Sequence, residues 1–334
     1  MYVATEADTV YALAADSGSV LWNTTVGVPV PSGDLPCGDI NPSVGITSTP
    51  VIDQALGEVF VVADELVNSV PAHVLVALNM YNGAVLFRQD VDPPGADTAA
   101  ILQRSSLTLD QGNVVFGYGG NIGDCSTYHG WVASVPETGG PMATFEVDSG
   151  AGERQGAVWM GGAAPIVDAS GNIWVATGNG SVTSTSPYDS SDSVLELSPS
   201  LTLKQYFAPT NWSSDNAADR DLGSSSPALL PNGSVVQAGK SQTAFLLSQS
   251  SLGGIGGQEG EIPTCGGQDV DGGNAVSGDA VYMPCQGGVV AVHASARARR
   301  PLLSSGRRPP DPVDRPSWRG GWSGPSSRTA YSSA

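Results

Sequence analysis

The fold is decided by Val10-Tyr-Ala-Leu-Ala-Ala-Asp-Ser-Gly-Ser-Val-Leu-Trp22, a stretch that recurs without a gap as Leu75-Val-Ala-Leu-Asn-Met-Tyr-Asn-Gly-Ala-Val-Leu-Phe87. Each copy reads as a strand, a turn that contains Gly after Ser or Asn, a second strand and a final aromatic residue. Each copy is therefore predicted to form a β-hairpin.

Further short strands surround both hairpins. β-branched runs precede them at Tyr2–Thr5 and Val59–Ala63. Looser copies of the pattern follow, each with two predicted strands: Val114–Tyr118 with Trp131–Val135, Ile173–Thr177 with Val194–Leu197, Ser234–Ala238 with Ala244–Leu247, and Ala280–Met283 with Val289–His293. Three or four short strands per repeated unit are typical of one propeller blade. The sequence therefore predicts an all-β propeller of four-stranded blades, with about six blades visible and seven or eight expected in the full gene.

The composition agrees with a single domain that contains few helices. The chain has 334 residues, 43 Gly, 24 Pro and 14% charged residues, which suits many short strands and tight turns. The formal charge of −18 includes a contribution of +6 from residues 296–334, so residues 1–295 carry −24. So acidic a body should repel nucleic acid and anionic membranes, and no apolar run is long enough to span a membrane.

Four cysteines point to disulfide bonds. Cys37, Cys125, Cys265 and Cys285 allow three pairings and have no zinc-site spacing. We expect Cys37 to pair with Cys125 and Cys265 with Cys285, which implies an extracellular or periplasmic location. No signal peptide precedes the first strand, so we expect the true N-terminus to lie upstream of Met1.

The repeat pattern stops near residue 295. From Ala296 the chain becomes rich in Arg and loses its alternation of apolar and polar residues. Residues 1–295 are predicted to form the propeller, truncated at both ends. Residues 296–334 are interpreted as a disordered basic tail, either natural or the product of a frameshift.

The repeats resemble those of the pyrroloquinoline quinone (PQQ)-like β-propeller family. This family includes PQQ-dependent alcohol dehydrogenases and a non-enzymatic outer-membrane assembly propeller. The pattern Ala-Leu-x-x-x-x-Gly-x-x-Leu-Trp/Phe occurs at Ala12–Trp22 and Ala77–Phe87. Four further segments are similar to the dehydrogenase branch and to poorly characterised secreted bacterial members, and they occur in the same order: Gly45–Asp53, Gly123–Trp131, Ala157–Gly162 with Ala176–Gly180, and Asp219–Pro227 with Gly239-Lys240.

The resemblance implies a central site for PQQ and calcium. Trp159 matches the tryptophan that lies under the quinone ring, and Asn179 matches an amide ligand of calcium. Asp221 matches the aspartate that binds the metal and takes the proton of the alcohol, a role that Asp219 could also fill. Lys240, one of two lysines in the chain, matches the cation that contacts the quinone oxygens.

Each of these four positions also has a purely structural interpretation. Trp159 could be a core residue, and Asn179 could belong to a Gly-Asn-Gly turn. Asp221 could belong to a salt-bridged turn, and Lys240 could be an exposed residue at the end of a strand. His73, His129 and His293 lie far apart in sequence and are interpreted as structural or surface residues.

Several features depart from the dehydrogenase pattern. Asp124 stands in the segment where the family supplies a calcium-binding glutamate, and the pair of adjacent cysteines is missing. Arg220 replaces the tryptophan before the catalytic aspartate. No Cys-x-x-Cys-His haem motif is present, so an enzyme would need a separate electron acceptor.

Two hypotheses remain open from the sequence. The chain is either a calcium- and PQQ-dependent dehydrogenase of alcohols or related small hydroxylated substrates, or a secreted, non-catalytic propeller that binds a protein or a carbohydrate.

Overall fold

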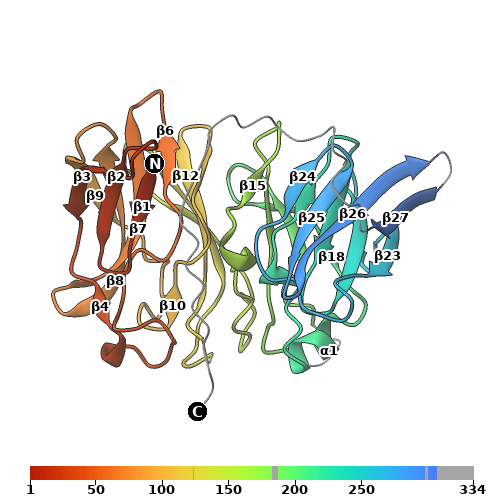
Figure 1. Cartoon of the computed structure of the whole chain (residues 1–334). Helices are drawn as coiled ribbons and strands as arrows, with labels where there is room; N and C mark the ends of the chain where they lie inside the picture. The colour runs from red at the N-terminus through yellow and green to blue at the C-terminus, as the bar shows by residue number, and fades with distance from the viewer. Residues whose placement is uncertain (123, 183–186, 298–299, 307–334) are drawn as a thin grey trace, which may run out of the picture.

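The computed structural model describes residues 1–122, 124–182, 187–297 and 300–306. Figure 1 shows sheets of short strands that follow one another in chain order, from red at the N-terminus to blue at the C-terminal side. Among the described residues, six sheets have three to five strands and one further sheet has two. The predicted all-β architecture of repeated small sheets is confirmed, while a full count of seven or eight blades stays a prediction.

Three of the larger sheets and the two-stranded sheet come from the N-terminal half. Their strands, in chain order, are β1 (Tyr2–Ala4), β2 (Thr9–Leu13) and β3 (Val20–Thr25); β4 (Val30–Pro31) and β5 (Ser43–Val44); β6 (Val51–Asp53), β7 (Glu58–Val67), β8 (Val70–Asn79) and β9 (Val85–Asp90); and β10 (Ile101–Leu102), β11 (Thr108–Asp110), β12 (Asn113–Gly120), β13 (Trp131–Pro136) and β14 (Ala143–Glu146).

The other three sheets come from the C-terminal half. They contain β15 (Ile166–Val167), β16 (Ile173–Ala176), β17 (Val194–Leu197), β18 (Leu203–Ala208) and β22 (Gly254–Ile255); β19 (Ala228–Leu229), β20 (Ser234–Ala238), β21 (Thr243–Ser248) and β23 (Gly260–Pro263); and β24 (Ala275–Ser277), β25 (Ala280–Cys285), β26 (Gly288–Arg297) and β27 (Arg300–Gly306). The helical segments that the structure describes are α1 (Trp212–Ala217) and the short 3-10 helices η1 (Ser32–Asp34), η2 (Met160–Gly162) and η3 (Leu222–Ser224). None of them is long and apolar enough to cross a membrane.

The two aligned repeats fold in the same way down to their irregularities. In the first hairpin the strand register shifts after Ala12, which lies opposite Trp22, and in the second it shifts after Ala77, which lies opposite Phe87. Gly18 and Gly83 occupy the same place in the two turns with φ of 71° and 73°, a conformation that favours glycine. The repeat in the sequence is therefore a repeat of backbone geometry.

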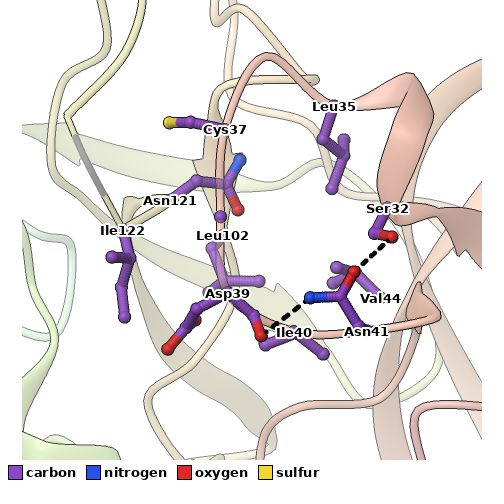
Figure 2. A pocket seen from close by; sticks show the side chains of 11 residues that line it. Ser32, Leu35, Cys37, Asp39, Ile40, Asn41, Val44, Leu102, Asn121 and Ile122 are labelled. Carbon is purple, nitrogen blue, oxygen red and sulfur yellow. Dashed lines mark hydrogen bonds between the residues drawn. The ribbon is translucent and has the colours of Figure 1, made fainter.

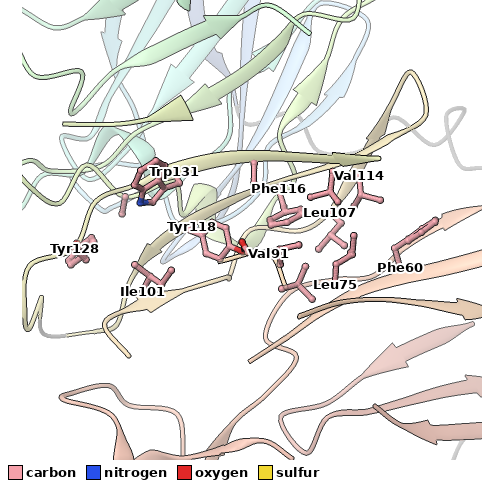
Figure 3. Packing of buried hydrophobic residues seen from close by; sticks show 14 of the residues in the cluster. Phe60, Leu75, Val91, Ile101, Leu107, Val114, Phe116, Tyr118, Tyr128 and Trp131 are labelled. Carbon is pink, nitrogen blue, oxygen red and sulfur yellow. The ribbon is translucent and has the colours of Figure 1, made fainter. Parts of the chain in front are cut away.

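Apolar side chains between neighbouring sheets form the core. In the N-terminal half, Phe60 of β7 and Leu75 of β8 belong to the same buried cluster as Phe116 and Tyr118 of β12 (Figure 3). All four side chains are fully buried. Burial of one such side chain contributes about 1.5–3 kcal/mol, so packing between sheets is a major source of stability.

The outer strand of one sheet also bonds to a hairpin turn of the next sheet. The indole N–H of Trp22, on β3, donates to the carbonyl of Met80 at 3.1 Å, and a Cβ at Gly83 would clash with the Trp22 ring. The side chain of Gln89, on β9, both donates to and accepts from the backbone of Gly140 at 2.7 and 2.9 Å. We call these two contacts the rim latches.

Both predicted disulfides are confirmed. Cys37 is bonded to Cys125 and Cys265 to Cys285, with Cα–Cα distances of 6.0 and 5.5 Å, which lie in the usual range for disulfides. The first bond joins the loop between β4 and β5 to the loop between β12 and β13. The second joins the loop after β23 to the end of β25.

The last two strands that the structure describes extend into residues 296–334, the segment predicted to be a tail. β26 runs past residue 295 to Arg297, and β27 pairs with it over Arg300–Gly306. Residues 298–299 and 307–334 lie outside the described residues. The interpretation of residues 307–334 as a basic tail stays a prediction.

Candidate functional site

Three of the site residues predicted from the sequence meet around one buried carboxylate. Asp221 directly precedes η3 and is 5% exposed. Its Oδ2 lies 2.5 Å from the Lys240 ammonium, and its Oδ1 accepts a hydrogen bond of 2.8 Å from the backbone N–H of Asn179. The structure thus brings Asn179, Asp221 and Lys240 together from three separate segments.

The backbone builds this arrangement through close approaches that only glycine permits. A Cβ at Gly178 would clash with Asp221 Oδ1, and a Cβ at Gly239 would clash with the carbonyl of Asp221. The same carbonyl accepts the backbone N–H of Lys240 at 2.9 Å. The Gly178–Gly180 turn and the Gly239-Lys240 strand end therefore hold Asp221 in place.

Asp219 closes the outer side of the site. Its side chain is 77% exposed, and its Oδ1 accepts hydrogen bonds from Asn179 Nδ2 at 2.9 Å and from Lys240 Nζ at 3.1 Å. Asn179 Nδ2 thus faces Asp219, while Asn179 Oδ1 is buried with no hydrogen-bond partner among the described residues. An unpartnered buried amide oxygen is free to bind a cation or a donor group.

The electrostatics of the site are governed by burial and by the Asp221–Lys240 pair. Burial raises the pKa of Asp221, while the Lys240 ammonium and the Asn179 N–H act in the opposite direction. Burial alone would lower the pKa of Lys240, but the Asp221 carboxylate outweighs it and raises that pKa above its ordinary value. Lys240 therefore carries a positive charge at neutral pH.

Trp159 packs away from this cluster, although the segment that follows it approaches η3. It directly precedes η2, whose backbone approaches η3: a Cβ at Gly161 would lie 2.7 Å from the carbonyl of Ser224. The Trp159 ring packs on Gly119 of β12, and the Arg104 guanidinium lies 5.7 Å from the ring centroid. Within the described residues, no hydrogen bond joins Trp159 to Asp221.

Asp124 is held by another residue. Its side chain accepts a hydrogen bond of 2.7 Å from the Tyr128 hydroxyl. Burial raises the pKa of Tyr128, and the nearby carboxylates Asp124 and Asp221 add to this effect. Among the described residues, no hydrogen bond joins Asp124 to Asn179 or Asp221.

Sequence reasoning missed Arg104 and Tyr128. Arg104 supplies a cation over the face of Trp159, a favourable arrangement, and Tyr128 lies next to the matched Asp124. Tyr128 lies within a segment that resembles the family, and this was the signal available in the sequence. Arg104 had no such signal, because it becomes relevant only through its contact with Trp159.

Two of the cavities lined by described residues lie away from Asp221. The first, of about 90 Å³, lies beside the loop between β4 and β5. Figure 2 shows the bond from Ser32 to Asn41 across one side of it, with Asn121 and Cys37 nearby. This cavity is smaller than the roughly 300–1,000 Å³ of typical ligand pockets. The second cavity is larger and is described below.

The geometry can be compared with known proteins. A family model described as outer membrane protein assembly factor BamB matches residues 1–200, and the chain belongs to this family of PQQ-like repeat propellers. No curated protein matches the chain.

Solved structures support the same fold. The chain is similar to quinohemoprotein alcohol dehydrogenase ADHIIG from Pseudomonas putida HK5, with 15% identity, a TM-score of 0.61, and coverage of 92% of this chain and 54% of that chain. It is also similar to quinohemoprotein alcohol dehydrogenase from Comamonas testosteroni, with 18% identity, a TM-score of 0.59, and coverage of 88% and 51%. A third similar structure, Sqt1 from Chaetomium thermophilum, has 10% identity, a TM-score of 0.53, and coverage of 88% and 67%. The chain spans about half the length of the two dehydrogenases, and at these identities the likeness shows the fold alone.

Proposed function

We propose that the chain is a PQQ-like propeller whose Asp221 site supports dehydrogenation of small hydroxylated substrates. The observation that carries the proposal is the buried Asp221 carboxylate, held between the Lys240 ammonium and the Asn179 N–H beside an unpartnered Asn179 Oδ1. Asp221 belongs to a segment that resembles the dehydrogenase branch. We propose an extracellular or periplasmic location, because the two disulfides are typical of oxidising compartments.

The donor set fits calcium in part. Asn179 Oδ1 and the Asp221 carboxylate are the hard oxygen ligands that calcium prefers, and Asn179 Oδ1 has no other partner among the described residues. Calcium takes about 6–8 oxygen ligands, so most of them would come from water and a bound quinone. Asp124 bonds to Tyr128 instead, and we assign it no ligand role on this geometry.

Different residues of the site would have different roles in the reaction. Asp221 would accept the proton of the substrate hydroxyl; burial raises the pKa of this carboxyl, and the nearby Lys240 ammonium acts against burial and favours the ionised form. Lys240 would also stabilise negative charge on a neighbouring oxygen. Trp159, which the resemblance matches to the tryptophan under the quinone ring, would provide an apolar surface. When bound, PQQ would take up the hydride and calcium would act as a Lewis acid.

The test is a titration of the purified full chain with PQQ and calcium chloride, followed by absorbance, and then by dye reduction with simple alcohols. We expect saturable binding that depends on calcium, and a loss of dye reduction of at least about 100-fold in Asp221→Asn, in line with the loss of a general base. Lys240→Gln should weaken PQQ binding, and Lys240→Arg should restore it because the positive charge returns.

A matched control is Asp16→Asn, which removes one carboxylate from an exposed turn. It should bind PQQ like the parent chain. Absence of PQQ binding in the parent chain, or equal binding by Asp221→Asn and Lys240→Gln, would contradict the proposal.

The second candidate is a non-catalytic propeller that binds a protein or a carbohydrate. The match to a family described as an assembly factor supports it, as does the Arg104 guanidinium on one face of Trp159. A parent chain that folds but binds no PQQ would favour this function.

A further inference from the structure

The second cavity lies between two neighbouring sheets. It has a volume of about 350 Å³, and its walls come from the end of β14 and the residues after it, from the loop before β17, and from the start of β18. It shares no lining residue with the Asp221 site, although the two are neighbours: Gly178 approaches Asp221, and Gly180 approaches Asp189 in the cavity wall. Its size falls within the range of small-molecule pockets.

The wall of this cavity is strongly acidic. Four carboxylates line it, and none of the described residues that line it is basic: the four are Glu146, Asp148, Glu153 and Asp189. The ten described lining residues thus place four carboxyl groups around one cavity, in a body that is already acidic. Such a cavity attracts a cation.

Two of the carboxylates are buried without the partners that burial requires. Asp148 is 1% exposed, and neither of its oxygens has a hydrogen-bond partner among the described residues. Asp189 is 4% exposed, and its Oδ2 has none, while its Oδ1 accepts from the Ser191 N–H at 3.1 Å and from the Ser191 hydroxyl at 2.5 Å. A buried carboxyl without partners is costly, so a donor group that entered the cavity and reached these oxygens would stabilise them.

Aromatic side chains form the apolar part of the wall. Phe145 and Tyr188 both line the cavity. Tyr188 is stacked on Tyr206, with ring centroids 4.5 Å apart and planes inclined by 18°, and it meets Trp212 edge to face at 5.5 Å. Its position is therefore fixed by packing, and a fixed aromatic face can bind both a carbon chain and a cation.

These features distinguish an organic cation from a metal ion. Among the described residues, no group of three or more His, Cys, Asp or Glu is placed to hold a metal. The cavity is also about ten times larger than the roughly 30 Å³ that one water molecule occupies in the liquid. A metal ion would fill little of this space, whereas an aliphatic amine would use both the carboxylates and the aromatic wall.

We propose that this cavity binds a small aliphatic amine, with its ammonium group against Asp148 and Asp189 and its carbon chain against Phe145 and Tyr188. The ammonium supplies three hydrogen-bond donors, which match the three unpartnered oxygens of the two aspartates. Glu146 and Glu153, which are nearer the solvent, add attraction at the entrance.

The charge state of Asp148 gives the proposal a pH signature. Burial, followed by the charges of Asp189, Glu153, Asp192 and Glu146 in that order, raises the pKa of Asp148 to about 10. His129 also lies at this site, with Nδ1 3.1 Å from the Asp148 carbonyl and 3.6 Å from Glu146. An ammonium ligand displaces the proton of Asp148, so binding should release a proton and tighten as the pH rises from about 6 to 9, below the pKa of about 10.4 typical of an alkylammonium.

The experiment is isothermal titration of the full chain with 1,4-diaminobutane at low salt, in two buffers of different ionisation enthalpy. We expect a Kd below about 1 mM, which corresponds to about 4 kcal/mol, together with proton release. The uncharged analogue 1,4-butanediol should bind at least about 10-fold more weakly, because it lacks the ammonium groups.

Two isosteric variants and one control locate the site. Asp148→Asn and Glu153→Gln should each weaken the binding of 1,4-diaminobutane, by about 10-fold or more and about 3-fold respectively. The first removes the buried carboxyl group that becomes ionised when the ammonium binds, and the second removes a half-buried carboxylate. Asp16→Asn, which removes an equal charge from an exposed turn, should leave the Kd within about 2-fold. Glu153→Gln keeps the proposal testable should Asp148→Asn fail to fold.

Three outcomes would overturn the proposal. They are no saturable binding of 1,4-diaminobutane up to about 10 mM, equal Kd values in all three variants, or a Kd for 1,4-butanediol equal to that of the diamine. Binding of calcium chloride in place of the diamine, with the same dependence on Asp148, would also overturn it and assign the cavity to a metal ion.

Discussion

In two successive sheets of this propeller, an aspartate stands at the same structural position but has different surroundings. After the outer strand β9, the N–H of Val91 bonds to the carbonyl of His73 at 2.9 Å; after the outer strand β14, the N–H of Val147 bonds to the carbonyl of Gly130 at 2.9 Å. Each valine is fully buried, and each is followed by an aspartate, Asp92 or Asp148. The two aspartates are therefore equivalent in the repeat.

The first aspartate has its partner within the chain. Asp92 Oδ1 lies 2.8 Å from His73 Nδ1 and accepts the His73 backbone N–H at 3.0 Å. Asp64 lies on the other side of the fully buried His73 ring, 3.8 Å from Nε2. Burial alone would lower the pKa of His73, but Asp64 and Asp92 outweigh it and raise that pKa. Charges of opposite sign thus compensate one another within this sheet.

The second aspartate has no such partner, for a steric reason. A Cβ at Gly130 would collide with the carbonyl of Gly156, so no side chain can stand where His73 stands. Asp148 keeps both oxygens unpartnered and faces the acidic cavity instead. One fold position therefore serves as an internal ion pair in one sheet and as a proposed cation site in the next.

The largest effect should come from removing the internal partner. His73→Ala leaves Asp64 and Asp92 facing a cavity with no cation, and the loss of one member of a buried pair costs about 3–5 kcal/mol. Urea denaturation should show a lower midpoint at an unchanged m-value. A loss below about 1 kcal/mol would show that the ion pair is not what stabilises this position.

The next largest effect should come from adding a side chain at Gly130, the position in the second sheet that corresponds to His73. Gly130→Ala introduces the Cβ that collides with the Gly156 carbonyl, and overpacking of this kind costs about 1–3 kcal/mol. Thermal unfolding should show a lower Tm. Gly33→Ala is a suitable control, because a Cβ at Gly33 would meet no atom within 4 Å and Gly33, unlike Gly18, does not have a positive φ. It should leave the Tm nearly unchanged. Equal Tm values for Gly130→Ala and the parent chain would contradict the steric explanation.

The smallest effect should be a gain in stability that depends on pH. The pKa of Asp148 is raised to about 10 by burial, whereas an unfolded Asp ionises near pH 4. Between these values the folded chain holds a proton that the unfolded chain has lost, so stability falls as the pH rises. Asp148→Asn removes this dependence.

The advantage of Asp148→Asn over the parent chain should therefore grow steadily from pH 5 to pH 9. Urea midpoints measured across this range, without added amines, provide the check. Asp16→Asn should follow the parent chain at every pH. Parallel curves for Asp148→Asn and the parent chain would show that Asp148 is not protonated by burial.

The sequence predicted the fold because hairpins depend on local patterns. The alignment of Val10–Trp22 with Leu75–Phe87 anticipated equal hairpins, since the apolar alternation and the turn glycine set the register. The disulfide pairs were also predictable. Of the three possible pairings, we expected the one that joins each cysteine to its neighbour in the sequence, Cys37 to Cys125 and Cys265 to Cys285, and the structure contains these two bonds. The strand β27 was not predicted, because its residues lack the alternation of the other strands.

The candidate site was predictable only where a family motif marks it. Asn179, Asp221 and Lys240 were selected through resemblance, and the fold places them together. The same reasoning chose Asp124, which bonds to Tyr128 instead. The acidic cavity had no signal in the sequence, because Asp148 and Asp189 differ from exposed aspartates only in burial, which arises when distant segments pack.

The rim latches determine how load passes through the molecule. Trp22 contacts the turn that contains Gly83, and Gln89 hydrogen-bonds to the backbone of Gly140. A force on one sheet is therefore transmitted to the next by peripheral side chains as well as by the connecting chain. These side-chain contacts connect the first large sheet to the second and the second to the third. Tension applied at the N-terminus would therefore load these side-chain contacts as well as the chain that connects the first three large sheets.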